Sequence, residues 1–373
     1  MTATNQILKE RLNRWHSFVE GRTGSFMFLM YYPMPEAEAQ LPPAPPRWPD
    51  KLKERIERRW GEYQLMCRQA ELVNDDNVPF LSNMTGTEIF AEAFGCKVHR
   101  PTDNMPFALP FVHTAAEADA IKVPELSRSS LACLFDVADE LYRRGGPGSV
   151  MQMVDIQSPM DIVALIWDKA DLFCAMVESP DAVKGLAVKV RILLTSFFDE
   201  WFRRYGTTFV AHYPTYVMHG GLTMSVDEVG AVNPEMFQAF FRDELVSLAE
   251  HFGGLGIHCC ADARHQWENF RALPGLKVMN HNAPPTRDAR TYLMDSVRFY
   301  GDRVVQIPVG WNPDGSPETW PVQFPEGTRL VFSMWADNAD LAASIANRLQ
   351  GLRERLNSTG SREMPKELQQ EKE

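Results

Sequence analysis

The sequence contains no apolar run long enough to cross a membrane. A membrane-spanning helix needs about 18 or more apolar residues in succession, and no segment of this 373-residue chain approaches that length. The first segment, MTATNQILKERLNRWHSF, carries charges where a secretory signal peptide has its apolar core. We therefore expect a cytoplasmic protein without a membrane partner.

Positive charge is scarce as well. The chain has 38 Lys and Arg residues against 49 Asp and Glu residues, which gives a formal net charge of -11. A protein with this balance repels polyanions. The composition therefore argues against nucleic acid as a partner and favours a small molecule or another protein.

Several sequence signatures of known chemistry are also missing. The six cysteines, at positions 67, 96, 133, 174, 259 and 260, lack the short repeated spacing of a disulfide framework or a zinc ribbon. The chain has no glycine-rich phosphate loop, no nucleophile elbow and no HExxH motif. We expect reduced thiols, and we disfavour nucleotide-dependent and serine hydrolase chemistry.

What the sequence does have is a regular alternation of short apolar segments and amphipathic helical segments. Eight segments have the length and apolar content of β-strands, and most of them precede a helical pattern. They cover residues 25–32, 77–83, 149–155, 207–213, 254–260, 276–282, 302–309 and 328–335. This order predicts the α/β class and a single (β/α)8 TIM barrel over residues 1–350.

Other segments complete the expected organisation. Helical patterns cover residues 6–19 and 50–72, and between them residues 33–49 are so rich in proline that we expect a long loop or a lid. An insertion at about residues 84–148 separates the second strand from the third. Residues 351–373 are polar, and we expect them to form a frayed C-terminal tail.

The segment GLGIHCC, residues 254–260, places metal-binding residue types at the end of a strand. Strand residues two positions apart lie on one face, so His258 and Cys260 point together and Cys259 points the other way. The C-terminal ends of barrel strands face the active site. His258 and Cys260 are therefore candidate metal ligands. The alternative is a hydrogen-bonded histidine in the barrel mouth with thiols that are merely packed.

Two longer stretches resemble a known family. The run SVDEVGAVNPEMFQAFFRDELVSLAEHFGGLGIHCC is similar to the uroporphyrinogen decarboxylase superfamily, in which a Ser-x-Asp region and a PEMF helix start precede a strand ending in His-x-Cys. The run ADLFCAMVESPDAVKGLAVKV is similar to the middle region of that superfamily. The resemblance spans most of residues 149–282. It implies a TIM barrel that performs either porphyrinogen decarboxylation or zinc-dependent methyl transfer with a corrinoid protein.

The resemblance also implies a role for the His-x-Cys pair. In methyltransferases of the superfamily this pair binds zinc, which makes a thiolate of the methyl acceptor, and a second cysteine near the last strand completes the set. This chain reads VFSMWADN at that place, and no cysteine follows Cys260. Because zinc also accepts carboxylate and imidazole ligands, Asp227, Glu228 and His281 are candidates to replace the missing thiolate.

Acidic residues near the strand ends are candidates for catalysis. Asp155 follows the third strand, where a carboxyl group suits an acid, a base or a substrate anchor; the alternative role of helix cap is better filled by Ser158, which precedes Pro159. Asp227 and Glu228 belong to HGGLTMSVDEVG, which we expect to be a loop on the catalytic face. The alternative for this acidic pair is solvated loop charge before a helix.

Other strand-end side chains complete the expected site. Tyr213 and Asn280 belong to the polar and aromatic rim as candidate substrate contacts, and His281 beside Asn280 is a further catalytic candidate. Trp311 and Trp335 come at the ends of the last two strands, where they could line a flat pocket for an aromatic or corrin face. The alternative for the tryptophans is a contact in a homodimer, a state that is common in the superfamily.

Three functions are compatible with these sequence features. A true uroporphyrinogen decarboxylase binds a substrate with eight carboxylates, and the family places arginines just after the first strand. Here that strand leads into YYPMPEAEAQLPPAPP, without a base before Arg47. Methyl transfer between a small substrate and a corrinoid protein is therefore the first expectation. Porphyrinogen decarboxylation is the second, and a non-catalytic member that binds a small molecule is the third.

Overall fold

The structure is a computed structural model of the chain, and it describes residues 3–22, 26–44, 50–83, 85–101, 104–309 and 316–359. The α-helices are α1 (Ala3–Val19), α2 (Pro35–Glu38), α3 (Leu52–Leu72), α4 (Ile89–Ala93), α5 (Ala115–Ala120), α6 (Ala132–Gly145), α7 (Pro159–Ile166), α8 (Lys169–Glu178), α9 (Pro180–Tyr205), α10 (Pro234–Phe240), α11 (Arg242–Phe252), α12 (Trp267–Arg271), α13 (Ala289–Tyr300) and α14 (Ala339–Thr359). Short 3-10 helices are η1 (Leu126–Arg128), η2 (Glu228–Ala231), η3 (Arg264–Gln266) and η4 (Pro317–Gln323).

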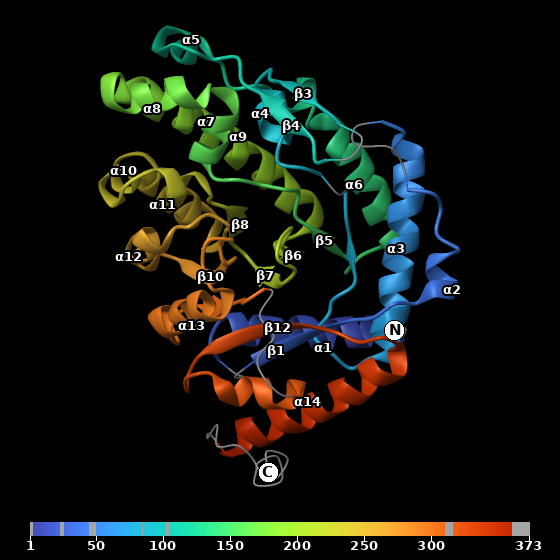
Figure 1. Cartoon of the computed structure of the whole chain (residues 1–373). Coiled ribbons are helices and arrows are strands. Elements are labelled where there is room, and N and C mark those ends of the chain that lie inside the picture. Colours follow the sequence, from blue (N-terminus) through green and yellow to red (C-terminus); the bar gives the residue numbers. More distant parts are fainter. Residues whose placement is uncertain are drawn as a thin grey trace.

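The strands are β1 (Phe26–Tyr31), β2 (Phe80–Leu81), β3 (Lys97–His99), β4 (Phe107–Leu109), β5 (Val150–Gln152), β6 (Thr208–Val210), β7 (Val217–His219), β8 (Leu222–Ser225), β9 (Leu255–Cys259), β10 (Leu276–His281), β11 (Val305–Gln306) and β12 (Arg329–Trp335). Six of them form a parallel sheet in the order β1-β12-β11-β10-β9-β8. A second sheet has the order β2-β5-β6-β7, in which only β7 is antiparallel to its neighbour. The strands of these two sheets lie at the centre with helices around them, whereas β3 and β4 pair with each other outside them (Figure 1); the α/β class is confirmed.

Backbone hydrogen bonds connect the two sheets at both edges. At one edge, Ser225 of β8 donates its N–H to the carbonyl of Ile156 at 3.0 Å, and Ser158 donates its N–H to Ser225 at 2.8 Å. At the other edge, Asp76 donates its N–H to the carbonyl of Phe28 in β1, and its carboxylate accepts the N–H of Phe28. Both edge strands of the six-stranded sheet, β1 and β8, therefore contact segments of the chain that adjoin strands of the second sheet.

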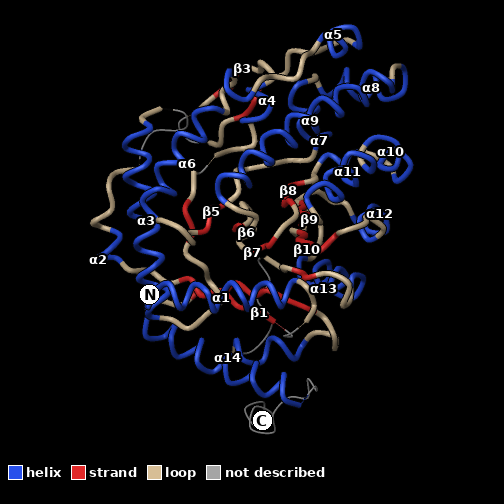
Figure 2. The backbone as a smooth tube through the Cα atoms, turned by 180° about the vertical axis from the view of Figure 1, so that it is seen from behind, coloured by secondary structure: helices blue, strands red, loops and turns tan. Residues whose placement is uncertain are grey.

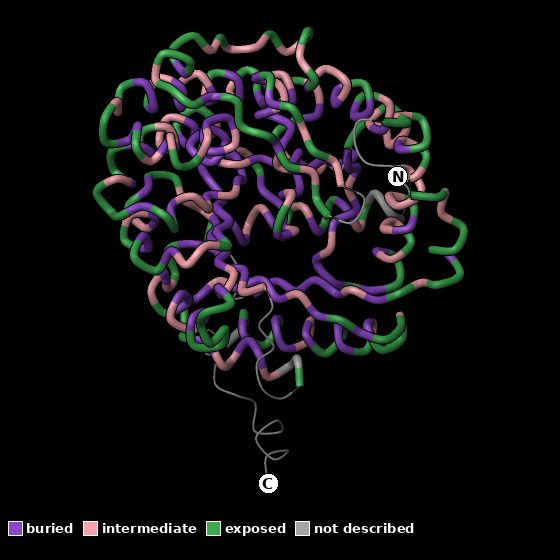
Figure 3. Tube along the Cα trace, turned by 45° about the horizontal axis from the view of Figure 1, so that its top comes forward, coloured by how far each residue is buried: buried purple, intermediate pink, exposed green. Residues whose placement is uncertain are grey.

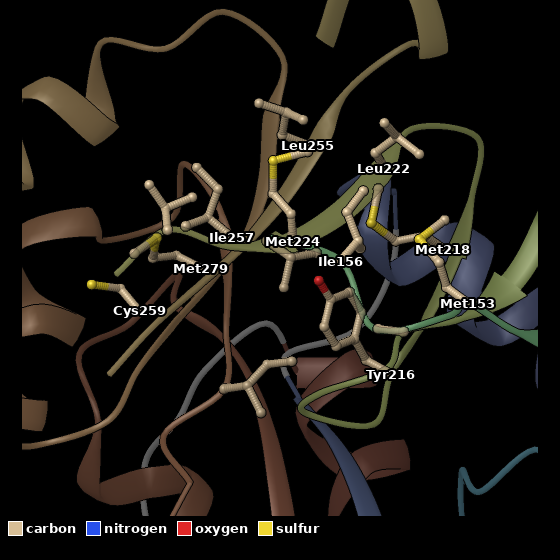
Figure 4. Close-up of a cluster of buried hydrophobic side chains, with 14 of the residues drawn as sticks. Met153, Ile156, Tyr216, Met218, Leu222, Met224, Leu255, Ile257, Cys259 and Met279 are labelled. Carbon is tan, nitrogen blue, oxygen red and sulfur yellow. The ribbon is translucent and has the colours of Figure 1, made fainter. Parts of the chain in front are cut away.

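The helices cover the outer side of the strands, as the view from behind also shows (Figure 2). Colouring by burial places most buried residues along the strands and on the helix faces that meet them (Figure 3). Methionines fill much of the core around the strands, among them Met153, Met218, Met224 and Met279 (Figure 4). Flexible thioethers suit such an irregular interior. Within the described residues, no helix combines the length and apolar content that a membrane crossing requires.

Three local expectations differ from the structure. The segment HGGLTMSVDEVG, expected as a loop, contains the last residue of β7 and all of β8. The proline-rich segment contains α2, because Pro35 stands at the start of that helix, where its missing N–H costs no hydrogen bond. Helix α14 runs to Thr359, past the expected barrel end at residue 350.

The continuation of α14 has a physical reason. Leu352, Arg353 and Leu356 are buried. Arg353 donates to the carboxylate of Asp76 at 2.7 Å, and Arg14 of α1 contacts the same fully buried carboxylate at 2.7 Å. A buried carboxylate needs such partners to offset the loss of water. Asp76 therefore holds the C-terminal helix and the N-terminal helix against β1.

Tyr216 fills the interior next to the strand that leads to the candidate site. Its hydroxyl lies against Gly256 of β9, and a Cβ atom at position 256 would come within 2.1 Å of it. Figure 4 shows the Tyr216 ring between the core side chains of neighbouring strands. Gly256 is two residues before His258, so the close approach of Tyr216 is made on the same face of β9 as the histidine.

The variant Gly256→Ala tests this packing. We expect it to lower the free energy of unfolding by about 1–3 kcal/mol, because the added methyl group displaces the Tyr216 hydroxyl. Gly185→Ala in α9 is the matched control: a Cβ atom there meets nothing within 4 Å, and we expect a gain of up to about 1 kcal/mol from the better helix former. Urea denaturation measures both, and equal effects would contradict the packing described for Tyr216.

Candidate metal centre

The candidate centre lies where β8 and β9 end side by side. Ser225 of β8 pairs with His258 of β9, and the N–H of Val226 donates to the His258 carbonyl at 2.8 Å. This register brings Asp227, two residues after Ser225, next to Cys260, two residues after His258. The backbone N–H of Cys260 donates to the Asp227 carboxylate at 2.7 Å.

Asp227, His258 and Cys260 together offer three ligand atoms within 4.8 Å of one another. The three atoms are a carboxylate oxygen, an imidazole nitrogen and a thiol sulfur, and zinc accepts all three types. His258 is buried, whereas Cys260 is exposed, so the group opens towards solvent. The structure thus brings together His258 and Cys260, which the alternation of the strand predicts to point the same way. It adds Asp227, one of the three residues considered as a replacement for the missing cysteine.

The orientation of the His258 ring is fixed by Asn280 of β10. The Asn280 amide nitrogen donates to the carbonyl of Ile307, which turns the amide oxygen towards Nδ1 of His258 at 2.5 Å. An amide oxygen only accepts, so Nδ1 of His258 carries the proton and Nε2 keeps its lone pair. Burial lowers the pKa of His258. The ring is therefore neutral and suited to bind a metal through Nε2.

The two adjacent cysteines have different surroundings. Partial burial and the nearby Asp227 carboxylate raise the pKa of the Cys260 thiol to about 12, and this thiol also hydrogen-bonds to Asp227. Cys259 is fully buried on the other side of β9, and burial raises its pKa well above the usual value. Cys260 is therefore protonated near neutral pH, and its ionisation requires a cation in the site.

Asp161, which the sequence pattern does not single out, holds the backbone on which Asp227 sits. Its buried carboxylate accepts the N–H of Asp227 at 3.2 Å and that of Glu228 at 2.6 Å. Ser158 caps α7, the helix that contains Asp161, as expected. Burial raises the pKa of Asp161 to about 8, with a smaller contribution from the charge of Asp227. In sequence, Asp161 resembles an ordinary acidic residue in the first turn of a helix.

Asp155 lies close to His212, at the end of the neighbouring strand β6. Oδ2 of Asp155 is 3.4 Å from Nε2 of His212, and the Asp155 N–H donates to the hydroxyl of Thr85. Burial raises the pKa of Asp155 to about 7, and the charge of Asp227 adds to this; burial lowers the pKa of His212 to about 4. Between these two values the pair is a neutral acid and a neutral imidazole, so Asp155 is suited to donate a proton.

Glu88, in the segment after β2, is a second acidic residue that was not among the candidates from sequence. It is completely buried, and neither carboxyl oxygen has a hydrogen-bond partner among the described residues. Burial raises its pKa, and the charge of Asp155 contributes in the same direction. A Cβ atom at position 86, now Gly86, would lie 2.4 Å from Oε2 of Glu88 and would collide with this carboxyl group. Glu88 follows a strand end, so the position after a strand that marks Asp155 as a candidate marks Glu88 as well.

Two of the candidate residues lie apart from the three ligand atoms. Glu228 pairs with Lys169 at the start of α8, at 2.6 Å. His281 pairs in register with Cys259, not with His258, and contacts the hydroxyl of Tyr300 at 3.2 Å among aromatic rings of the helix layer. Because successive side chains of β10 point to opposite faces, Asn280 points inwards and His281 points outwards.

Of the two aromatic candidates within the described residues, one lies beside His258 and the other lies on the surface. The ring of Tyr213 stands edge-on to that of His258, with centroids 4.8 Å apart. Trp335 is 65% exposed and stacks on Tyr31, the last residue of the neighbouring strand β1. Tyr213 is thus beside the candidate metal ligands, and Trp335 is on the surface at the end of β12. Trp311 lies outside the described residues.

Comparison with known proteins adds evidence on the fold. No family model matches the chain, and no curated protein matches its sequence. A methyltransferase from Methanosarcina mazei is similar in structure, with a TM-score of 0.61 over 94% of this chain and 98% of that one. The two sequences are 12% identical. The two proteins therefore share a fold.

The raised pKa of Asp155 predicts a pH dependence of stability. A carboxyl group whose pKa rises from 3.8 to about 7 on folding binds its proton more tightly in the folded state. The stability of the metal-free protein should therefore fall as the pH rises from 3.8 through about 7, with up to about 4 kcal/mol due to Asp155. In Asp155→Asn this part of the slope disappears.

Urea unfolding in the presence of a chelator measures this slope. The control is Asp136→Asn, which changes an exposed aspartate of α6 and should leave the slope of the wild-type protein intact. An unchanged slope in Asp155→Asn would show that Asp155 ionises normally in the folded protein.

Proposed function

We propose that this chain is a metal-dependent methyltransferase of the uroporphyrinogen decarboxylase superfamily, which transfers a methyl group between a small substrate and a corrinoid protein. The observation that carries the proposal is the convergence of Asp227, His258 and Cys260 at the ends of two adjacent strands. The similarity in fold to a methyltransferase supports it. The proposal includes zinc as the metal, and a homodimer as the state in which the enzyme works.

The proposed fold for this function is a closed eight-stranded TIM barrel. Its ring consists of β1, β2, β5, β8, β9, β10, β11 and β12. Here β8 takes the place of the strand expected at residues 207–213, which forms β6 and pairs with β5 on one side and with the antiparallel β7 on the other. The joins of β8 to the segment after β5, and of the segment around Asp76 to β1, support closure at the two places between the sheets. In such a barrel the three ligands stand at the C-terminal mouth, where TIM-barrel enzymes have their active sites.

The side chains fit a catalytic zinc ion. Three protein ligands with a fourth position open is the usual arrangement of catalytic zinc, and the bound ion acts as a Lewis acid that lowers the pKa of a substrate thiol. Asn280 holds the His258 ring so that Nε2 is available, and Asp161 holds the Asp227 backbone. The exposed position of Cys260 leaves the open side towards solvent.

The protein side chains supply the proton transfer that methyl transfer needs. Methyl transfer from a corrinoid to a thiol would break the cobalt–carbon bond and leave its electron pair on cobalt, form a sulfur–carbon bond, and pass the thiol proton to a base. The carboxyl group of Asp155 lies beside His212, and its pKa of about 7 allows it to exchange a proton near neutral pH. We assign this exchange to Asp155 and the orientation of its carboxyl group to His212.

The two other functions have less support. The mouth gathers the carboxyl groups of Asp155, Asp161 and Asp227, which disfavour a substrate with eight carboxylates. A non-catalytic binding protein has no need for strongly shifted acids, yet the pKa values of Asp155 and Asp161 are raised to about 7 and about 8. Shifted acids of this kind are typical of functional sites.

The first test is metal binding. We expect about one zinc ion per chain, and we expect its loss in His258→Ala, Cys260→Ala and Asp227→Asn. Because the Cys260 pKa is about 12, zinc binding to the wild-type protein at neutral pH must release the thiol proton. Elemental analysis gives the stoichiometry, and calorimetry in buffers of different ionisation enthalpy gives the proton count.

Cys174→Ala provides the matched control for the thiol variants, because Cys174 is an exposed cysteine of α8 away from the candidate centre. It should bind zinc as the wild-type protein does. Zinc that persists in both His258→Ala and Cys260→Ala would contradict the site.

The second test is methyl transfer itself. Zinc-loaded protein is incubated with methylcobalamin and a panel of small thiols, and the loss of methylcobalamin is followed by absorbance. We expect Cys260→Ala to react at the background rate. Asp155→Asn should keep its zinc and lose about a hundredfold in rate. Consumption of uroporphyrinogen without any demethylation of methylcobalamin would instead support the decarboxylase.

A further inference from the structure

A large cavity lies at the opposite end of the strands from the candidate metal centre. It has a volume of about 690 Å³, within the usual range for small-molecule sites. Ser149, just before β5, and Thr208, the first residue of β6, line it, whereas Cys259 and Cys260 come at the far end of β9. Helix α1 lies against β7 at this end (Figures 1 and 2) and forms one wall.

The charge of the cavity wall is unusual for this chain. No Asp or Glu is among the described residues that line it, although the chain has 49 acidic residues against 38 basic ones. Lys9 of α1 lines the cavity and is exposed, and it forms no ion pair with any described residue. A free ammonium group in a wall without carboxylates favours an anion.

The wall also contains a buried donor without an acceptor. Arg22 contacts Nε2 of His16 at 2.7 Å, and because a guanidinium group can only donate, the proton of the His16 ring is on Nδ1. This Nδ1 is buried and has no partner among the described residues. This atom is closed to solvent, so it is out of reach of a molecule in the cavity, and His16 contributes its ring to the wall. The ring of His219 stands edge-on to His16, with centroids 5.0 Å apart, and also lines the cavity.

The other lining residues determine what kind of anion fits. Leu8, Leu12 and Val217 supply an apolar surface, and Tyr63 contributes a ring. Helix α6 ends at Gly145 in the wall, and the C-terminal end of a helix carries partial negative charge. One fully charged lysine beside such a helix end suits a single carboxylate better than a doubly charged phosphate.

We propose that this cavity binds a small organic acid with an apolar body and one carboxylate. The carboxylate accepts from Lys9, and the apolar body packs against Leu8, Leu12 and Val217. The inference is independent of the proposed methyltransferase function, because the cavity shares no residue with the metal centre. It adds a second small-molecule site, at the other end of the strands.

Three naphthalene compounds test the proposal, because they share an apolar body and differ in the head group. These are 1-naphthylacetate, the neutral 1-naphthylacetamide and 1-naphthyl phosphate, each titrated into the full chain with fluorescence and calorimetric detection. We expect the carboxylate to bind about fivefold more tightly than the amide and more tightly than the phosphate.

The variants identify the site. Lys9→Gln should abolish the preference for the carboxylate over the amide. Lys53→Gln, which changes an exposed lysine of α3 outside the cavity, should leave the preference intact. Cys260→Ala should bind the carboxylate as the wild-type protein does, even if zinc binding is lost, which separates this result from the test of the metal centre.

Several results would overturn the proposal. Equal binding of the carboxylate and the amide excludes recognition of the charge, and an unchanged preference in Lys9→Gln places the acid elsewhere. Tighter binding of the phosphate means that the chemical class is wrong. No binding of any of the three compounds at millimolar concentration means that the cavity is not a site for this class of ligand.

Discussion

The candidate centre depends on the alternation of side chains along two neighbouring parallel strands. In β9 this alternation turns His258 inwards and Cys259 outwards, and in β10 it turns Asn280 inwards and His281 outwards. Because the register pairs Asn280 with His258, the amide reaches the ring and fixes its tautomer. A shift of one residue in either strand would exchange the inner and outer sets and leave neither a ligand nor its support.

Buried acidic groups lie near the candidate centre, and the negative charges of Asp155 and Asp227 add to the effect of burial on their pKa values. Burial keeps the pKa values of Asp155 and Asp161 near neutral, and Glu88 is buried without a partner among the described residues. Each of these groups carries a proton more readily than it does in water. A divalent cation beside Asp227 opposes the negative charge that helps to raise these pKa values. Metal binding and protonation are therefore alternative ways to relieve the same repulsion.

The sequence predicts the parts of this arrangement that depend on local periodicity. The apolar runs of β1, β9, β10 and β12 and the inward direction of His258 follow from neighbouring residues alone. The role of Asp161 does not, because its partners, the N–H groups of Asp227 and Glu228, are more than sixty positions away. Strand β8 is not evident from the sequence because two glycines precede its four residues, and its pairing with β9 is what makes it a strand.

A carboxylate in place of a second thiolate changes what the proposed centre can do. Thiolates are soft ligands that donate much electron density, whereas a carboxylate is a harder ligand and donates less. With one thiolate, from Cys260, and one carboxylate, from Asp227, the ligands still balance the two charges of a zinc ion. A zinc ion held by these residues would keep more of its Lewis acidity than with two thiolates and would polarise a bound substrate more strongly. The fixed Asp227 backbone, held by Asp161, is what allows a shorter, harder ligand to take that place.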